Sequence, residues 1–291
     1  MEKLRLLGGH VSTSGGLVKA LGRGDAIGAE VIQIFSNSPR GWKAQRISLG
    51  EFDSISAARQ STGTRVWRVV SHASYLINLA TPDPDLYEKS VRLLCETMSF
   101  GGGIGVSSVV LHVGSHRGAG FKSQLGQILA AIELALLGSS DIELLVENSA
   151  GAGDSIGSTL EEIAEILRGV DAGIRLGVCL DTQHLFAAGF AFNGAKEAQK
   201  IGNALDSTLG AGSIRCVHLN DSKVKLGSRV DRHENLGEGE IGLDALGHLL
   251  AQSVLESADI ILECPGAGDG PRLQDVEVAR SLLSVQQTST T

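Results

Sequence analysis

Eight short apolar runs, rich in β-branched residues, recur along the 291-residue chain and predict buried strands. The expected strands are Leu4–Leu7, Val31–Phe35, Val66–Val70, Ser108–Val113, Ile142–Glu147, Ile174–Asp181, Ile214–Asn220 and Asp259–Glu263. Several of these runs are almost uniformly apolar, which is typical of parallel strands covered on both faces. Segments with helical periodicity lie between them and include Tyr87–Phe100, Gln124–Leu137, Thr159–Leu167 and Leu243–Leu255.

Strands that alternate with helices indicate βα units and a parallel sheet. Eight such units in a chain of this length favour an α/β fold of the closed (β/α)8 TIM-barrel type over an open doubly wound sheet. The glycine-rich fingerprint that a dinucleotide-binding fold requires does not follow the first strand. We expect one barrel domain over residues 1–284 and a polar tail over residues 285–291.

The composition is that of a globular protein, with 42% hydrophobic and 20% charged residues, and it argues against intrinsic disorder. The sequence contains neither a membrane-spanning stretch nor a secretory signal. Its four cysteines lack the CxxC spacing and are expected to be reduced thiols. We therefore expect a cytoplasmic protein. The serine-elbow and P-loop motifs are also missing, so acyl transfer and P-loop phosphoryl transfer have no support.

Metal-ligand residue types end six of the expected strands: His72, His112, Glu147, Asp181, His218 and Glu263. In a barrel these strand ends meet at the face that carries the active site. Taken singly, such a histidine is more often a hydrogen-bonded core or loop residue, and such a carboxylate often caps the next helix. Six together favour a metal centre, because crowded carboxylates with little water around them need a cation.

Two local motifs add further ligand candidates. In Asp181-Thr-Gln-His184 an imidazole follows the strand-end carboxylate within one turn, and in Asp231-Arg-His233 two side chains can point to one side of a loop. Mixed imidazole and carboxylate ligands suit Zn²⁺, Mn²⁺ or Fe²⁺ better than Ca²⁺ or Mg²⁺. Nine candidates are too many for one ion and about right for three.

At these residues the sequence resembles the endonuclease IV family of apurinic/apyrimidinic endonucleases, along nearly the whole chain. The most specific matches are His72-Ala-Ser-Tyr75-Leu-Ile-Asn78, Gly177-Val-Cys-Leu-Asp181-Thr-Gln-His184, and His218-Leu-Asn-Asp-Ser followed by Gly227-Ser-Arg-Val-Asp231-Arg-His233. The resemblance implies zinc-dependent hydrolysis of DNA on the 5′ side of an abasic site, leaving a 3′-hydroxyl, and similar trimming of blocked 3′ ends.

Carried over position by position, the resemblance implies three zinc sites, in which Mn²⁺ or Fe²⁺ could substitute. The first is held by His72, His112 and Glu147, the second by Glu147, Asp181, His218 and Glu263, and the third by His184, Asp231 and His233. Glu147 bridges two ions, and Glu263 is also expected to orient the attacking water, so we expect these two to be catalytic. The family's DNA-inserting positions are occupied by Arg40 and Tyr75.

Three departures lie beside these ligands: Val113 where the family usually has proline, Gln183 where it has cysteine, and Cys264 where threonine is commoner. They put rate and metal preference in doubt more than function. The formal net charge of −8 also looks unfavourable for DNA binding. Three divalent ions would offset most of it, and Lys223, Lys225, Arg229 and Arg232 cluster in the loop after the seventh strand.

Two alternatives remain. A sugar isomerase or epimerase of the same barrel type would need one or two metals, with no use for the Asp231-Arg-His233 motif, Arg40 or Tyr75. A DNA-damage-binding protein without activity would hold abasic DNA uncut at full metal occupancy. The favoured interpretation is a monomeric endonuclease whose partner is duplex DNA with an abasic site, without a membrane or an obligate protein partner.

Overall fold

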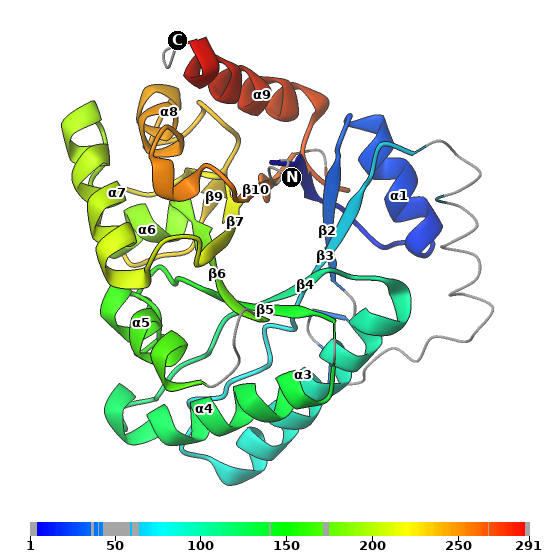
Figure 1. Cartoon of the computed structure of the whole chain (residues 1–291), viewed down its shortest axis with the longest axis vertical. Coiled ribbons are helices and arrows are strands. Elements are labelled where there is room, and N and C mark those ends of the chain that lie inside the picture. Colours follow the sequence, from blue (N-terminus) through cyan, green and yellow to red (C-terminus); the bar gives the residue numbers. More distant parts are fainter. Residues whose placement is uncertain are drawn as a thin grey trace.

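The computed structural model describes residues 5–35, 38–39, 41–42, 59, 64–139, 141–170, 175–266 and 268–288. Parallel strands close into an eight-stranded barrel in which each strand pairs with the next and β10 pairs with both β7 and β1 (Figure 1). The strands are β1 (Leu7–His10), β2 (Val31–Phe35), β3 (Arg68–His72), β4 (Ser108–Leu111), β5 (Glu143–Glu147), β6 (Leu176–Asp181), β7 (Ile214–His218) and β10 (Asp259–Leu262). The predicted α/β barrel is thus confirmed.

Helices surround the strands (Figure 1). They are α1 (Leu17–Ala26), α3 (Pro84–Ile104), α4 (Phe121–Leu137), α5 (Leu160–Gly169), α6 (Thr182–Ala188), α7 (Ala195–Leu209), α8 (Leu243–Leu250) and α9 (Leu273–Thr288), with a 3₁₀ turn at Ser253–Leu255. In the part of the chain that the structure describes, no helix combines the length and the apolar character that crossing a membrane requires.

Local capping explains where two of these helices begin. Asp83 caps α3 by accepting a hydrogen bond from the backbone N–H of Asp85 at 3.0 Å, next to a proline in the first turn. Thr159 caps α5 by accepting from the N–H of Glu162 at 3.3 Å, as the sequence predicts. The Glu162 carboxylate accepts from the N–H of Gly157 instead of reaching back to Thr159.

The first expected strand, Leu4–Leu7, is wrong in register: β1 lies at Leu7–His10. Its central residues, Gly8 and Gly9, look like loop residues in the sequence. In the barrel they are required by close packing, since a Cβ on Gly8 would lie 1.7 Å from the carbonyl oxygen of Val31.

Smaller differences occur at other element ends. The third strand is shifted to Arg68–His72, where it pairs with all of β2, and the seventh ends at His218 because Asp221–Ser222 forms a separate strand, β8. β8 pairs antiparallel with β9 (His233–Glu234), a hairpin that the sequence pattern did not predict. Helix α9 continues to Thr288, into the segment 285–291 expected to be a tail.

The barrel interior is layered. One apolar layer takes a residue from each strand or its start: Leu6, Val31, Val70, Val110, Leu145, Cys179, Cys216 and Ile261. Because side chains alternate along a strand, the residue two positions further on points into the same interior. For seven of the eight strands, that next inward residue is polar, so an apolar floor lies directly beneath a polar layer at the carboxyl ends of the strands.

Candidate metal centre

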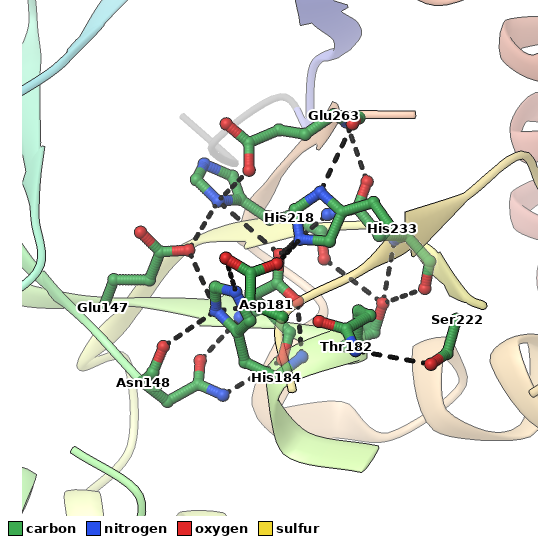
Figure 2. Close-up of polar contacts among 12 residues, drawn as sticks. Glu147, Asn148, Asp181, Thr182, His184, His218, Ser222, His233 and Glu263 are labelled. Atoms are coloured by element: carbon green, nitrogen blue, oxygen red, sulfur yellow. Dashed lines mark hydrogen bonds and ion pairs between the residues drawn. The ribbon is translucent and has the colours of Figure 1, made fainter. Parts of the chain in front are cut away.

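The polar layer joins side chains toward the carboxyl end of every strand of the barrel; β4 and β10 end at Leu111 and Leu262, earlier than expected, so His112 and Glu263 directly follow them. Its members are His10, Gln33, His72, His112, Glu147, Asp181, His218 and Glu263. Most of them are buried: Gln33, Glu147, Asp181 and His218 are each 0% exposed. Figure 2 shows Glu147, Asp181, His218 and Glu263 pointing toward one another from the carboxyl ends of different strands. The sequence predicted six of these eight as metal ligands, and the structure brings all six together.

A first group forms around one oxygen of Glu147. Glu147 Oε2 lies 3.1 Å from Nε2 of His72 and 3.1 Å from Nε2 of His112. The three ligand atoms lie within 4.8 Å of one another, a spacing at which one ion can bind them all. This is the set of residues that the family resemblance assigns to the first ion.

A second group shares Glu147 through its other oxygen. Glu147 Oε1 lies 3.0 Å from Nδ1 of His218, and Glu263 Oε2 lies 3.1 Å from the same nitrogen. Asp181 Oδ2 is 3.9 Å from it. One ligand atom from each of these four residues falls within a common 4.8 Å cluster, which matches the set expected for the second ion.

A third group lies where β6 runs into α6. Asp181 caps that helix by accepting from the N–H of His184 at 2.7 Å, which places the imidazole beside the strand-end carboxylate. Nε2 of His184 and Nε2 of His233 each lie 3.3 Å from an oxygen of Asp231. The hairpin of β8 and β9 therefore brings Asp231 and His233 to His184, the three residues that the family resemblance assigns to the third ion. The ligand atoms that fall within one 4.8 Å cluster here are those of Asp181, His184 and His233, and Asp231 contacts both histidines from outside that cluster.

Main-chain carbonyls orient the imidazole rings of His72 and His184. Nδ1 of His72 lies 2.7 Å from the carbonyl oxygen of Ala73, and Nδ1 of His184 lies 3.0 Å from that of Asn148. Each Nδ1–H donates to its carbonyl, which leaves Nε2 facing the carboxylates. Histidine ligands in metal sites are ordinarily oriented in this way.

Burial and charge act against each other in this centre. Burial alone would raise the pKa of Glu147, but the positive potential of His112 and His218 holds that pKa well below its usual value. Burial likewise works to lower the pKa of His218, whereas the charges of Glu263 and Glu147 raise it well above its usual value. The carboxylates are thus kept ionised by the surrounding imidazoles.

The residues present fit divalent metal ions. The ion-pair partners of Glu147 among the described residues are all histidines, with no lysine or arginine, so the buried negative charge lacks a permanent positive partner. Nε2 of His233 is buried and has no hydrogen-bond partner, although it faces Asp231. An unpaired imidazole nitrogen among carboxylates is a donor set typical of zinc and similar ions.

Sequence reasoning missed several residues that hold the ligands. Asn148 accepts from the N–H of Asp181 at 2.6 Å and donates to its carbonyl oxygen at 3.0 Å, and Asn220 donates to Asp181 Oδ2 at 2.7 Å. Gln33 donates to Glu263 at 2.6 Å. The available signal was a single polar residue, Gln33, inside an otherwise apolar strand.

The three departures from the family pattern are all buried beside ligands. Val113 and Cys264 pack in the core. Gln183 donates to the carbonyl oxygen of Val230 at 3.0 Å, so it ties α6 to the hairpin residue that precedes Asp231. Glutamine at this position therefore supports the third group through a contact that the shorter cysteine side chain could not make.

An open pocket of about 500 Å³ lies beside the metal centre. Phe35, Pro39 and Tyr75 form an apolar wall, and Glu263 reaches it from the metal centre. Tyr75 is 56% exposed, and its ring stands 5.3 Å from that of His72. Arg40, the other expected DNA-contacting residue, lies outside the described residues.

Positive charge is exposed on the hairpin side of the same face. Lys223, Lys225, Arg229 and Arg232 are all exposed there. The loop between β8 and β9 that carries them also carries Asp231, so positive charge stands next to the third group of ligands.

Comparison with known proteins agrees with this geometry. A family model described as a xylose isomerase-like TIM barrel matches residues 23–284. A probable endonuclease 4 of Halothermothrix orenii is 39% identical over 278 residues, covering 95% of this chain and 98% of the relative. One from Methanoculleus marisnigri is 39% identical over 262 residues, covering 89% and 92%.

This chain belongs to the endonuclease IV family. Membership makes it an enzyme, as the sequence predicts. The solved structure of endonuclease IV from Thermus thermophilus superposes with a TM-score of 0.82 at 35% identity and covers 96% of this chain and 99% of its own. A D-tagatose 3-epimerase-like protein superposes with a TM-score of 0.73 at 17% identity, covering 98% and 100%, which is a likeness of fold alone.

Proposed function

We propose that this member of the endonuclease IV family is a zinc-dependent DNA repair enzyme. It hydrolyses the phosphodiester bond 5′ to an abasic site in duplex DNA and leaves a 3′-hydroxyl and a 5′-deoxyribose phosphate, as base excision repair requires. The observation that carries the proposal is the meeting of nine ligand residues in three groups linked by Glu147 and Asp181.

Three zinc ions would be held by the three groups as the family resemblance implies, and manganese or iron could replace them. Bound there, the ions would neutralise negative charge on the phosphate oxygens and lower the pKa of a water molecule toward neutrality. The protein's own part is to fix the ligands: backbone carbonyls orient His72 and His184, and Asn148 and Asn220 hold Asp181.

Glu263 and Glu147 are the residues we expect to be catalytic. Glu263 borders the open pocket, while Glu147 is fully enclosed. Because Glu263 lies at the edge of the pocket, its carboxylate can accept a hydrogen bond from the attacking water and so orient that water toward the phosphorus. Glu147 instead joins two ligand groups through its two oxygens, so it fixes the spacing between them.

DNA must be distorted before this centre can reach a phosphodiester at an abasic sugar. Tyr75 projects from the same face and offers an aromatic surface to the exposed bases, and we assign Arg40 the same role from its sequence position. The pocket beside Glu263 can receive an extrahelical sugar. The basic hairpin supplies phosphate contacts, so binding should weaken as salt is raised.

Blocked 3′ ends are a second expected substrate, because removing a 3′ block also breaks a phosphate ester next to a 3′-oxygen. We further expect the enzyme to act as a monomer in the cytoplasm, with duplex DNA as its partner and no obligate protein partner.

The proposal is tested with a labelled duplex that carries one synthetic abasic site. Zinc-loaded protein should cut once, 5′ to the lesion, and mapping of the ends should find a 3′-hydroxyl. The Glu263→Gln protein should not cut the duplex. Glu256 is an exposed glutamate before β10, so the Glu256→Gln protein should cut normally. The absence of a cut by zinc-loaded wild-type protein would refute the proposal.

A sugar isomerase or epimerase built on the same type of barrel is the alternative function. Such an enzyme would bind its metal ions at the first two ligand groups, and Asp231 and His233 would have no role in its reaction. Incubation with ketohexoses and aldopentoses under the same zinc-loaded conditions distinguishes the two, since an epimerase would convert sugar and leave the abasic duplex intact.

A further inference from the structure

Gln33 contacts two ligand residues at once. It lies in β2, is 0% exposed and faces the barrel interior. Its Nε2 donates to Glu263 Oε1 at 2.6 Å, and its Oε1 lies 2.9 Å from Nε2 of His218. His10 Nδ1 completes the surroundings at 3.0 Å from both Gln33 Nε2 and Glu263 Oε1.

The carboxylate fixes which way this amide points. Turned the other way, Gln33 would place its carbonyl oxygen 2.6 Å from Glu263 Oε1, and two oxygens without a proton between them repel each other. The nitrogen must therefore face Glu263. The amide oxygen is then left toward His218, where it can only accept, so Nε2 of His218 is the donor.

This leaves Nδ1 of His218 for the ligand group. That nitrogen lies 3.0 Å from Glu147 Oε1 and 3.1 Å from Glu263 Oε2. His218 is thus oriented in the opposite sense to His72 and His233, whose Nδ1 atoms face main-chain carbonyls and whose Nε2 atoms face carboxylates. His184 also directs its Nδ1 to a main-chain carbonyl, at 3.0 Å, although Glu147 Oε1 lies 3.4 Å from the same nitrogen.

The difference matters because of what does the orienting. Main-chain carbonyls hold His72 and His184 whatever side chains surround them. The partner of His218 Nε2 is a side chain, and the same side chain also fixes Glu263. One substitution can therefore release two members of the second ligand group.

We propose that Gln33 is a positioning residue of the metal centre: it commits His218 to ligation through Nδ1 and aligns Glu263 for the same ion. The inference rests on the proposed metal centre. It predicts that loss of the Gln33 amide lowers the affinity for one of the three ions and leaves the barrel folded.

The test compares wild-type protein with Gln33→Met, which keeps the length of the side chain and removes the hydrogen bonds of the amide, including those to Glu263 and His218. The matched control is Gln127→Met on α4, whose amide donates to the carbonyls of Leu79 and Thr81 at 2.8 and 2.9 Å. Zinc affinity is measured by chelator competition, and the ligating ring nitrogens by long-range ¹H–¹⁵N NMR correlations of the zinc-loaded proteins.

In the wild type, His218 should ligate through Nδ1 and His72, His184 and His233 through Nε2. Gln33→Met should bind one zinc about 10–100-fold more weakly, the usual effect of losing an outer partner. The control should keep wild-type affinity for all ions. Unchanged zinc affinity in Gln33→Met, or ligation of wild-type His218 through Nε2, would overturn the inference. A wild-type protein that binds no zinc would instead refute the proposed function.

Discussion

Glu147 on β5 and His218 on β7 meet across the strand that separates them, with Glu147 Oε1 3.0 Å from His218 Nδ1. The second oxygen of the same carboxylate faces His72, at the end of β3, and His112, directly after β4. One buried side chain thus links two ligand groups, and its removal should affect both.

Glu147→Gln should therefore weaken the binding of two zinc ions at once. An amide cannot supply two anionic oxygens, so we expect zinc affinity at both groups, and incision of abasic DNA, to fall by at least about 100-fold, the upper end of what the loss of an outer partner costs. Zinc content by mass spectrometry and initial incision rates measure this. Glu143→Gln, four residues earlier on the same strand, is the control and should retain both properties.

Asp231→Ala should remove a single ion. Asp231 contacts His184 and His233, and among the described residues its ion pairs do not extend to the first two groups. We expect a protein with two bound zinc ions, a normal fold and an incision rate reduced by at least about 10-fold. A variant that keeps three ions, or one that loses all of them, would show that the third group is not a separate site.

Asp221→Asn should loosen the hairpin that carries the third group. The buried Asp221 carboxylate accepts backbone hydrogen bonds from Gly237, Gly239, Ile241 and Gly242. An amide nitrogen in place of one oxygen would face N–H donors, so the free energy of unfolding should fall by about 1–3 kcal/mol. Denaturant unfolding of the zinc-free protein measures this.

The matched control for the hairpin is Asp244→Asn, an exposed aspartate in the first turn of α8. It should change the unfolding free energy by less than about 1 kcal/mol. If the two substitutions lowered the free energy of unfolding equally, the hydrogen bonds from the 237–242 segment to Asp221 would not stabilise this part of the structure.

Tyr75→Ala should weaken DNA binding and leave the metals in place. Stacking of a base on an aromatic ring contributes about 1–3 kcal/mol, so affinity for the abasic duplex should fall by about 10–100-fold. The effect should appear in KM more than in kcat, and zinc content should not change. Tyr75→Phe keeps the ring and should bind nearly as well as the wild type. Normal KM in Tyr75→Ala would contradict a role in DNA contact.

The ligand residues were predictable because they occupy special positions in the chain. His72, Glu147 and Asp181 end runs of apolar residues, and the fold then brings all strand ends to one face. The third group was predictable from the spacing of Asp231 and His233, although the β8–β9 hairpin that positions them was not. Two-residue strands leave no periodic pattern to find.

What could not be predicted depends on contacts between distant segments. Gly8 looks like a loop residue until the carbonyl of Val31 is seen to require it, and Gly9 until Pro271 packs against it. Gln33 looks like an irregularity in a buried strand until Glu263, 230 positions away, approaches it. Such residues are defined by their tertiary neighbours, and the local sequence carries no trace of those neighbours.

The central claim, that the three ligand groups together make a metal-dependent endonuclease, is tested most directly by zinc titration of the metal-free protein. Incision 5′ to a single abasic site and the number of bound ions are followed in the same samples. We predict no incision before zinc is added and full incision as three ions bind. Full incision by the metal-free protein, or three bound ions without any cut, would contradict the account.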